Sequence, residues 1–234
     1  MRRLGNGGRL GGAALAVVLL AMPAEGQGLG GRASTPPDSP LTIARLRYAP
    51  GDWYANPTSL PNLLAFVREE LELSTADREA VVSATDPSLG RYPLLYLTGH
   101  GDIRLTEAEV RSLRGYLVGG GFLHADDNFG IDSTLRREIA RVFPEEPLVE
   151  LPADHPIYRA AFPLPTGLPK VHEHAGGSPR GYGVYHDGRL VVFYSFNTDL
   201  GDGWEDAAVH GDPPVVRRAA LEMGANVFVY ALTH

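Results

Sequence analysis

A chain of 234 residues, 44% hydrophobic and 21% charged, is long enough for one globular domain with a substantial core. Its formal net charge of −7 argues against a nucleic-acid-binding surface, because a negatively charged protein repels a phosphate backbone. The absence of cysteine excludes disulfides, thiolate metal ligands and every cysteine nucleophile.

The N-terminus has the layout of a secretory signal peptide. Arg2, Arg3 and Arg9 precede an apolar run over residues 10–21, and small residues follow that run. The run is shorter than the roughly 20 residues that span a bilayer. We therefore expect a signal peptide over residues 1–26 and periplasmic or secreted localisation. An uncleaved segment would instead attach the protein to a membrane.

The residues after the expected signal divide into a linker and one folded domain. Residues 27–40 are rich in glycine, proline and serine, which is typical of a flexible linker. The folded domain is expected over residues 41–234. Its first segment, residues 41–48, alternates apolar and polar positions as a half-buried strand does. Ser59 can then cap a helix over residues 60–71.

The middle of the chain continues as strands and helices in alternation. Strands are expected over residues 80–84, 94–98 and 122–125, and the continuous apolar run at 94–98 is typical of a strand covered on both faces. Thr106 and Glu109 form a capping box for one intervening helix, and a second helix should run from Asp132 or Ser133 to Val142. This order predicts a mostly parallel, doubly wound α/β sheet.

The last third of the chain departs from that alternation. Residues 152–179 contain many prolines and glycines and should form an irregular excursion. Residues 183–196 are expected to form a β-hairpin that turns at residues 186–188 and is appended to the sheet. An amphipathic segment over residues 214–232 closes the chain.

Seven sequence blocks carry a resemblance to a known family. They are RLRYAPGDW (45–53), YPLLYLTGHG (92–101), LRGYLVGGGFLHADD (113–127), LPADHPIY (151–158), DGRLVVFYS (187–195), DLGDGWE (199–205) and GANVFVYALT (224–233). In this order they resemble the uncharacterised bacterial family called domain of unknown function 4159. The resemblance implies a three-layer fold similar to that of the class I glutamine amidotransferases, which is flavodoxin-like. The family has no assigned activity, so the resemblance informs the fold far more than the function.

The resemblance also bears on catalysis. In amidotransferases of this fold, the nucleophilic cysteine lies on a tight turn just after a central strand. The corresponding turn in this chain follows residues 122–125 and holds Asp126, Asp127 and Asn128. Because the chain contains no cysteine, glutamine hydrolysis by a cysteine route is excluded.

Polar side chains cluster where two expected strands end, and ligands bind at the carboxyl ends of strands in open parallel sheets. His124 and Asp126 should face the same side of the sheet, and Asp127 the other. Trp204 could offer an apolar platform to a carbohydrate or fill the core. The candidate ligand-binding residues are His100, Asp102, His124, Asp126, Asp127, Asp199 and Trp204.

Histidines elsewhere in the chain raise the question of a metal site. His155, His172 and His174 could supply ligands together with His100, but no HExxH or comparable spacing is present. The acidic stretch 197–206 also lacks the register of an EF-hand loop. We therefore expect loop histidines and no cofactor, with a divalent metal as the open alternative.

Three functions are compatible with these patterns. The leading prediction is a non-catalytic binding or scaffolding module of the bacterial envelope, which recognises a small polar ligand, a glycan or an envelope protein. Its pocket would be bounded by His100, Asp126 and Trp204. The alternative is a hydrolase that uses His100 and Asp126, with or without a divalent metal, on a carbohydrate or amide. The third is a purely structural envelope component.

Overall fold

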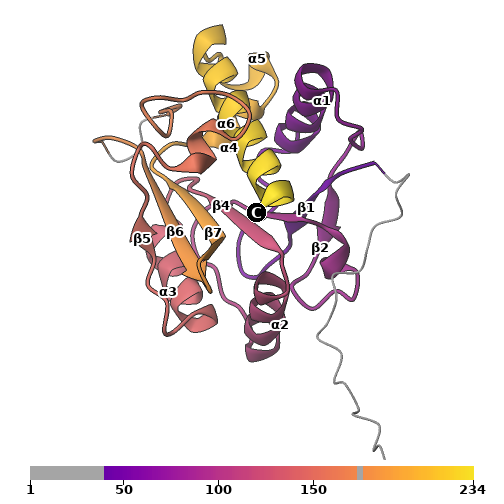
Figure 1. Ribbon diagram of the computed structural model, residues 1–234, viewed down its shortest axis with the longest axis vertical. Helices are drawn as coiled ribbons and strands as arrows, with labels where there is room; N and C mark the ends of the chain where they lie inside the picture. Colours follow the sequence, from indigo (N-terminus) through magenta and orange to yellow (C-terminus); the bar gives the residue numbers. More distant parts are fainter. Residues whose placement is uncertain (1–39, 173–175) are drawn as a thin grey trace, which may run out of the picture. The chain divides into compact units, whose positions relative to one another are not determined.

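The computed structural model describes residues 40–172 and 176–234 (Figure 1). The expected signal peptide, and the expected linker apart from Pro40, lie outside the described residues. Within the described ranges, no helix is both long enough and apolar enough to cross a membrane.

A seven-stranded sheet forms the centre of the fold, with strand order β2-β1-β3-β4-β7-β6-β5. The first five strands in this order pair in parallel. The last two pairings, β7 with β6 and β6 with β5, are antiparallel. The predicted α/β class with a mostly parallel sheet is confirmed. The strands are β1 (Ile43–Leu46), β2 (Ala80–Val82), β3 (Leu94–Leu97), β4 (Phe122–Asp126), β5 (Val149–Glu150), β6 (Arg180–His186) and β7 (Arg189–Phe196).

Helices cover both faces of the sheet, which gives three layers (Figure 1). One face packs against α1 (Ser59–Leu71), α4 (Leu200–Trp204) and α6 (Pro214–Thr233). The other face packs against α2 (Glu107–Val118) and α3 (Asp132–Val142). Alternate strand residues supply the two cores, because successive side chains of a strand point to opposite faces. Short helical turns complete the described part: η1 (Leu89–Arg91), η2 (Pro156–Arg159) and α5 (Ala207–His210).

The first strand is buried more fully than its sequence pattern predicts. β1 lies between β2 and β3, and all four of its residues are buried, including Arg45. The guanidinium of Arg45 donates to the carbonyl oxygens of Ala55 at 2.7 Å and Asn56 at 3.1 Å, and it pairs with Glu79 at 3.2 Å. The prediction of a half-buried strand was therefore wrong, because distant partners satisfy the one charged side chain.

The hairpin is part of the central sheet, so the prediction of an appended hairpin was wrong. β7 pairs in parallel with β4, and Ser195 lies opposite Asp126. The turn at Asp187 and Gly188, both with positive φ, connects β6 to β7, and β6 lies on the outer side of β7 in the sheet. This placement brings Ser195 to the carboxyl end of β4.

One predicted helix cap is present and another is not. Thr106 and Glu109 form the expected capping box at the start of α2. Ser59 is already the first residue of α1, and its side chain makes no cap. Instead, the Glu205 carboxylate accepts from the backbone amides of Thr58 at 2.8 Å and Ser59 at 3.1 Å. A cap supplied from a distant segment leaves no local sequence signal.

We predict that Arg45→Met lowers the free energy of unfolding by about 3–5 kcal/mol, because it leaves Glu79 and two carbonyl oxygens without their buried partner. The matched control is Arg47→Met, since Arg47 is exposed just past the same strand, and this variant should stay within about 0.5 kcal/mol of wild type. Urea unfolding of both variants measures the difference. Equal stability of the two variants would contradict the role assigned to Arg45.

Candidate functional site

Asp126, at the carboxyl end of β4, is fully buried and receives four hydrogen bonds. The Ser195 hydroxyl donates to Oδ1 at 2.6 Å, and the Tyr96 hydroxyl donates to Oδ2 at 3.1 Å. The backbone amides of Leu200 and Gly201 donate at 3.3 and 2.7 Å. Position 201 must be glycine for this approach, because a Cβ there would lie 2.6 Å from the Tyr96 hydroxyl oxygen. The carboxylate therefore joins β3, β4, β7 and the start of α4.

His124 lies on the same side of the sheet as Asp126, as predicted, and Ser195 lies between the two. The His124 Nε2 is 2.8 Å from the Ser195 Oγ. Because the serine hydroxyl donates its proton to Asp126, Nε2 of His124 acts as the donor to Ser195. Burial lowers the pKa of His124 to about 3, so the ring is neutral. In this arrangement Asp126, and not His124, accepts the serine proton, which differs from the order of groups in a nucleophilic triad.

The adjacent residue, Asp127, binds a different part of the backbone from Asp126. Its Oδ2 accepts from the amide of Asn197 at 2.9 Å, just past β7. Burial raises the pKa of Asp127 to about 6 and that of Asp126 to about 7. The hydrogen bonds from Ser195, Gly201 and Tyr96 limit the rise for Asp126. Both residues therefore act as internal anchors of the strand ends.

The acidic stretch after the hairpin contains the short helix α4 and is mostly buried. Trp204 is fully buried, and its Nε1 donates to the Ala220 carbonyl in α6 at 2.7 Å. It fills the core, so its indole is not exposed as a carbohydrate platform. Asp199 is also fully buried, and its pKa is raised to about 9 by burial and by the nearby Asp202 and Asp126 carboxylates.

His100 is the member of the expected His100, Asp126 and Trp204 set that reaches solvent, with its side chain 49% exposed. Its backbone amide donates to Asp52 Oδ1 at 2.5 Å, and its Nδ1 is 2.6 Å from Asp52 Oδ2. Asp52 therefore fixes the ring and leaves Nε2 on its outer side. Sequence reasoning missed Asp52, because it precedes His100 by 48 residues.

The loop after β4 carries an exposed aromatic residue, and its backbone comes close to the loop that holds His100. Phe129 is 59% exposed, and the following Gly130 approaches the backbone of Gly101. An exposed aromatic directly after the polar turn at 126–128 was the available sequence signal. Asp102, the remaining candidate of this region, is held in salt bridges by Arg104 at 2.5 Å and Arg137 at 3.1 Å.

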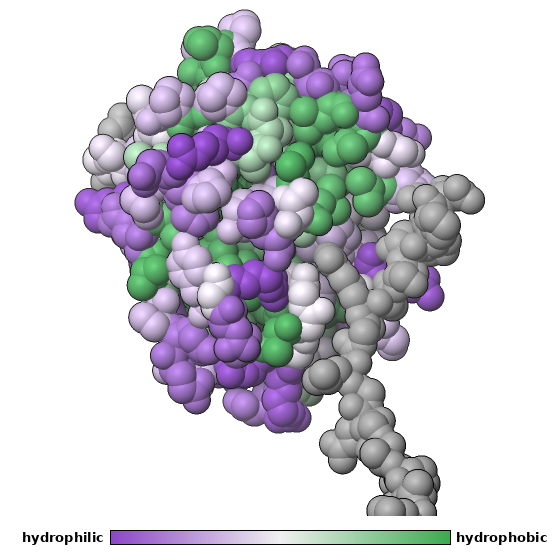
Figure 2. Space-filling view, in the orientation of Figure 1, coloured by the Kyte–Doolittle hydropathy of each residue, from purple (hydrophilic) through white to green (hydrophobic). Residues whose placement is uncertain are grey.

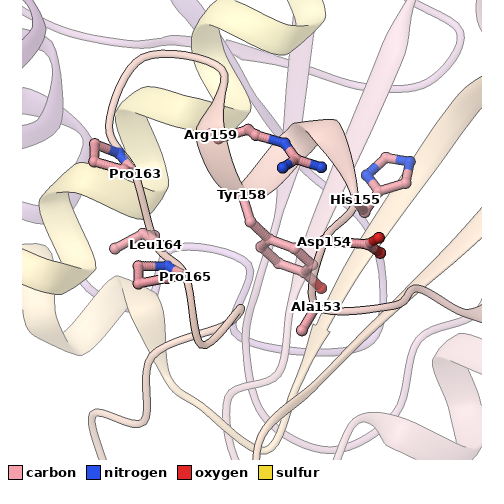
Figure 3. A pocket seen from close by; sticks show the side chains of 8 residues that line it. All are labelled: Ala153, Asp154, His155, Tyr158, Arg159, Pro163, Leu164 and Pro165. Atoms are coloured by element: carbon pink, nitrogen blue, oxygen red, sulfur yellow. The ribbon is translucent and has the colours of Figure 1, made fainter.

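The other histidines named from sequence lie apart from His100. His155 belongs to a hollow beside η2 (Figure 3), where its Nδ1 accepts from the Ile157 amide and its Nε2 is 2.9 Å from the Tyr185 hydroxyl. His172 lies beside Asp202 and His210, which are potential metal ligands. His174 lies outside the described residues.

Apolar side chains also gather on the surface over α1 and α6 (Figure 2). They form a shallow groove near the C-terminal ends of these helices, lined by Leu71, Leu73, Ala160, Ala161, Val229, Leu232 and Thr233. This groove lies on the face of the sheet that α1, α4 and α6 cover, and it contains none of the predicted site residues.

Comparison with known proteins identifies the family. The model of the family described as Domain of unknown function (DUF4159) matches residues 42–232, and the chain belongs to this family. No curated protein matches the chain. The resemblance stated from the seven sequence blocks is therefore confirmed at the level of the family.

The raised pKa values of Asp126 and Asp127 predict a pH dependence of stability. Above about pH 4 the unfolded chain releases these protons, whereas the folded chain keeps that of Asp127 up to about pH 6 and that of Asp126 up to about pH 7, so their contribution to stability falls as pH rises. Asp126→Asn removes one such group and should make the fall shallower, by up to about 1.4 kcal/mol per pH unit. Urea unfolding at pH 5, 6 and 7 measures the slopes.

The control for this measurement is Asp187→Asn, because the Asp187 side chain is 94% exposed. This variant should keep the wild-type slope. Wild-type and Asp126→Asn slopes that agree within error would show that Asp126 does not carry the expected proton in the folded state.

Proposed function

We propose that this domain is a non-catalytic binding module that recognises a small polar ligand, with a glycan as the best-suited class, at the carboxyl edge of its sheet. The observation that carries the proposal is the state of Asp126. It is fully buried, and its two oxygens accept four hydrogen bonds, so it has no free face for a substrate. If the fold is amidotransferase-like, this anchoring residue replaces the nucleophile.

The exposed groups at the same edge support ligand recognition. His100 is held by Asp52 and offers a polar ring edge, while Phe129 offers an apolar face. Aromatic faces beside a few fixed polar groups are typical of small-molecule and carbohydrate sites. The backbone at Gly99 and Gly101 has positive φ, so the chain turns tightly on either side of His100. A ligand at this edge would therefore contact His100 and Phe129 and leave Asp126 inside the core.

A second candidate function is hydrolysis, and the pair of Asp52 and His100 favours it. A carboxylate bound to Nδ1 orients an imidazole so that Nε2 can accept a proton from water or a substrate hydroxyl. In this version Asp126 positions the strand ends, and His100 is the group that contacts the substrate.

The two functions are distinguished with soluble peptidoglycan fragments and a panel of neutral oligosaccharides. We expect saturable binding by calorimetry, no new product by mass spectrometry, and binding at least about tenfold weaker in His100→Ala and Phe129→Ala, or a loss of about 1.4 kcal/mol. His186→Ala is the control, because His186 pairs with Glu146 away from this edge. No saturable binding to any probe would overturn the binding proposal. A product that disappears in His100→Ala would establish the hydrolase instead.

We further propose that the domain functions outside the cytoplasm of a bacterium, in the periplasm or after secretion. Support comes from the basic residues, apolar run and small residues of positions 1–26, which have the layout of a cleaved signal. Expression of the full chain in a Gram-negative host should give an extracytoplasmic product that begins near residue 27. Intact mass and cell fractionation measure this, and a cytoplasmic product with an intact N-terminus would contradict it.

A further inference from the structure

Two histidines and an aspartate converge beside α4, apart from His100. His172 comes from the segment before β6, Asp202 from α4, and His210 from the end of α5. One ligand atom from each lies within 4.8 Å of the other two. The three residues are separated by up to 38 positions in the sequence, so the fold alone brings them together.

The spacing of these atoms is close to that of a metal site. The His172 Nδ1 is 2.9 Å from Asp202 Oδ2, and the His210 Nε2 is 3.6 Å from Asp202 Oδ1. Ligands at about 2.0–2.1 Å from a tetrahedral ion lie about 3.4 Å apart. Since one ligand atom from each residue already lies within 4.8 Å of the other two, closing each separation by at most about 1.4 Å would place all three atoms around one ion.

Neighbouring residues hold the ligands by hydrogen bonds, as the outer partners of ligands do in metal sites. Asp212 Oδ1 is 3.0 Å from Nε2 of His172, which is the carboxylate–histidine arrangement that presents the other ring nitrogen to a metal. The Asn56 amide donates to Asp202 Oδ1 at 2.6 Å and fixes that carboxylate. Both contacts come from residues outside the three candidate ligands.

An independent observation is a buried oxygen that lacks a partner. The Asp212 side chain is only 10% exposed, and within the described ranges its Oδ2 has no hydrogen-bond partner. Asp199 adds a further fully buried carboxylate, with Oδ2 4.0 Å from the His172 Nδ1. Asp202 and Asp212 place two carboxylates beside the two imidazoles, and a dication would offset their negative charge.

We propose that His172, Asp202 and His210 bind a divalent transition-metal ion, with Zn²⁺ as the best-suited ion and Asp212 as a positioning residue. Two imidazoles and a carboxylate suit zinc and its transition-metal neighbours, whereas Mg²⁺ and Ca²⁺ prefer oxygen ligands alone. The ion would take the place of the direct contact between His172 and Asp202. It would fix the segment before β6 against α4 and α5, independently of what binds at His100.

The test uses the full chain after treatment with a chelator. We expect one equivalent of Zn²⁺ to bind by calorimetry, and one equivalent of Co²⁺ to produce visible absorption bands that Zn²⁺ abolishes and excess Mg²⁺ does not. His210→Ala should weaken zinc binding at least about 100-fold, and Asp212→Asn should weaken it about 10–100-fold. The His210 side chain is 30% exposed, so its removal leaves the core intact.

The matched control is His186→Ala, because His186 pairs with Glu146 at 2.8 Å and lies outside the cluster of His172, Asp202 and His210. This variant should bind zinc as wild type does. The proposal is overturned if wild type shows no saturable zinc binding, or if binding is unchanged in His210→Ala. Circular dichroism of each variant checks that it is folded.

Discussion

The burial of one carboxylate, Asp126, constrains the centre of this domain. An ionisable group without access to water costs several kcal/mol unless donors surround it, so each neighbouring element has to supply one. β3 supplies Tyr96, β7 supplies Ser195, and α4 supplies the amides of Leu200 and Gly201. These bonds fix the register in which Ser195 lies opposite Asp126, and they fix where α4 begins.

The short helix α4 connects Asp126 to the other helices on the same face of the sheet. It has five residues, too few to be stable through its own hydrogen bonds, so tertiary contacts hold it. Trp204 donates to α6, and Glu205, directly after α4, caps the start of α1. Asp202 accepts from Asn56 and lies beside His172. One buried acid thereby positions a core aromatic, a helix cap and the candidate metal ligands.

Local patterns predicted the elements of this fold better than their long-range partners. The capping box at Thr106 and the continuous apolar run of β3 are encoded by residues near each other in the chain, and both were predicted correctly. Arg45 was expected on the solvent side of its strand. The groups that accept its hydrogen bonds are carbonyls near Asn56 and the carboxylate of Glu79, and the sequence pattern of the strand does not show these distant partners. The hairpin did not reveal that β7 pairs with β4, because a continuous apolar run indicates a strand covered on both faces but does not identify its partner strand.

The same difference between local patterns and long-range partners applies to the candidate site. The sequence located the polar strand ends, yet it could not separate the buried anchors from exposed His100, whose partner Asp52 lies in a distant loop. The His172 cluster likewise lacks a motif, because its members come from three segments. Asn56 lies between the two regions: it donates to Asp202 Oδ1 and accepts from Asn128, the neighbour of Phe129. A cation that takes Oδ2 of Asp202 from His172 leaves both Asn56 bonds in place, so metal binding and the exposed edge are structurally compatible.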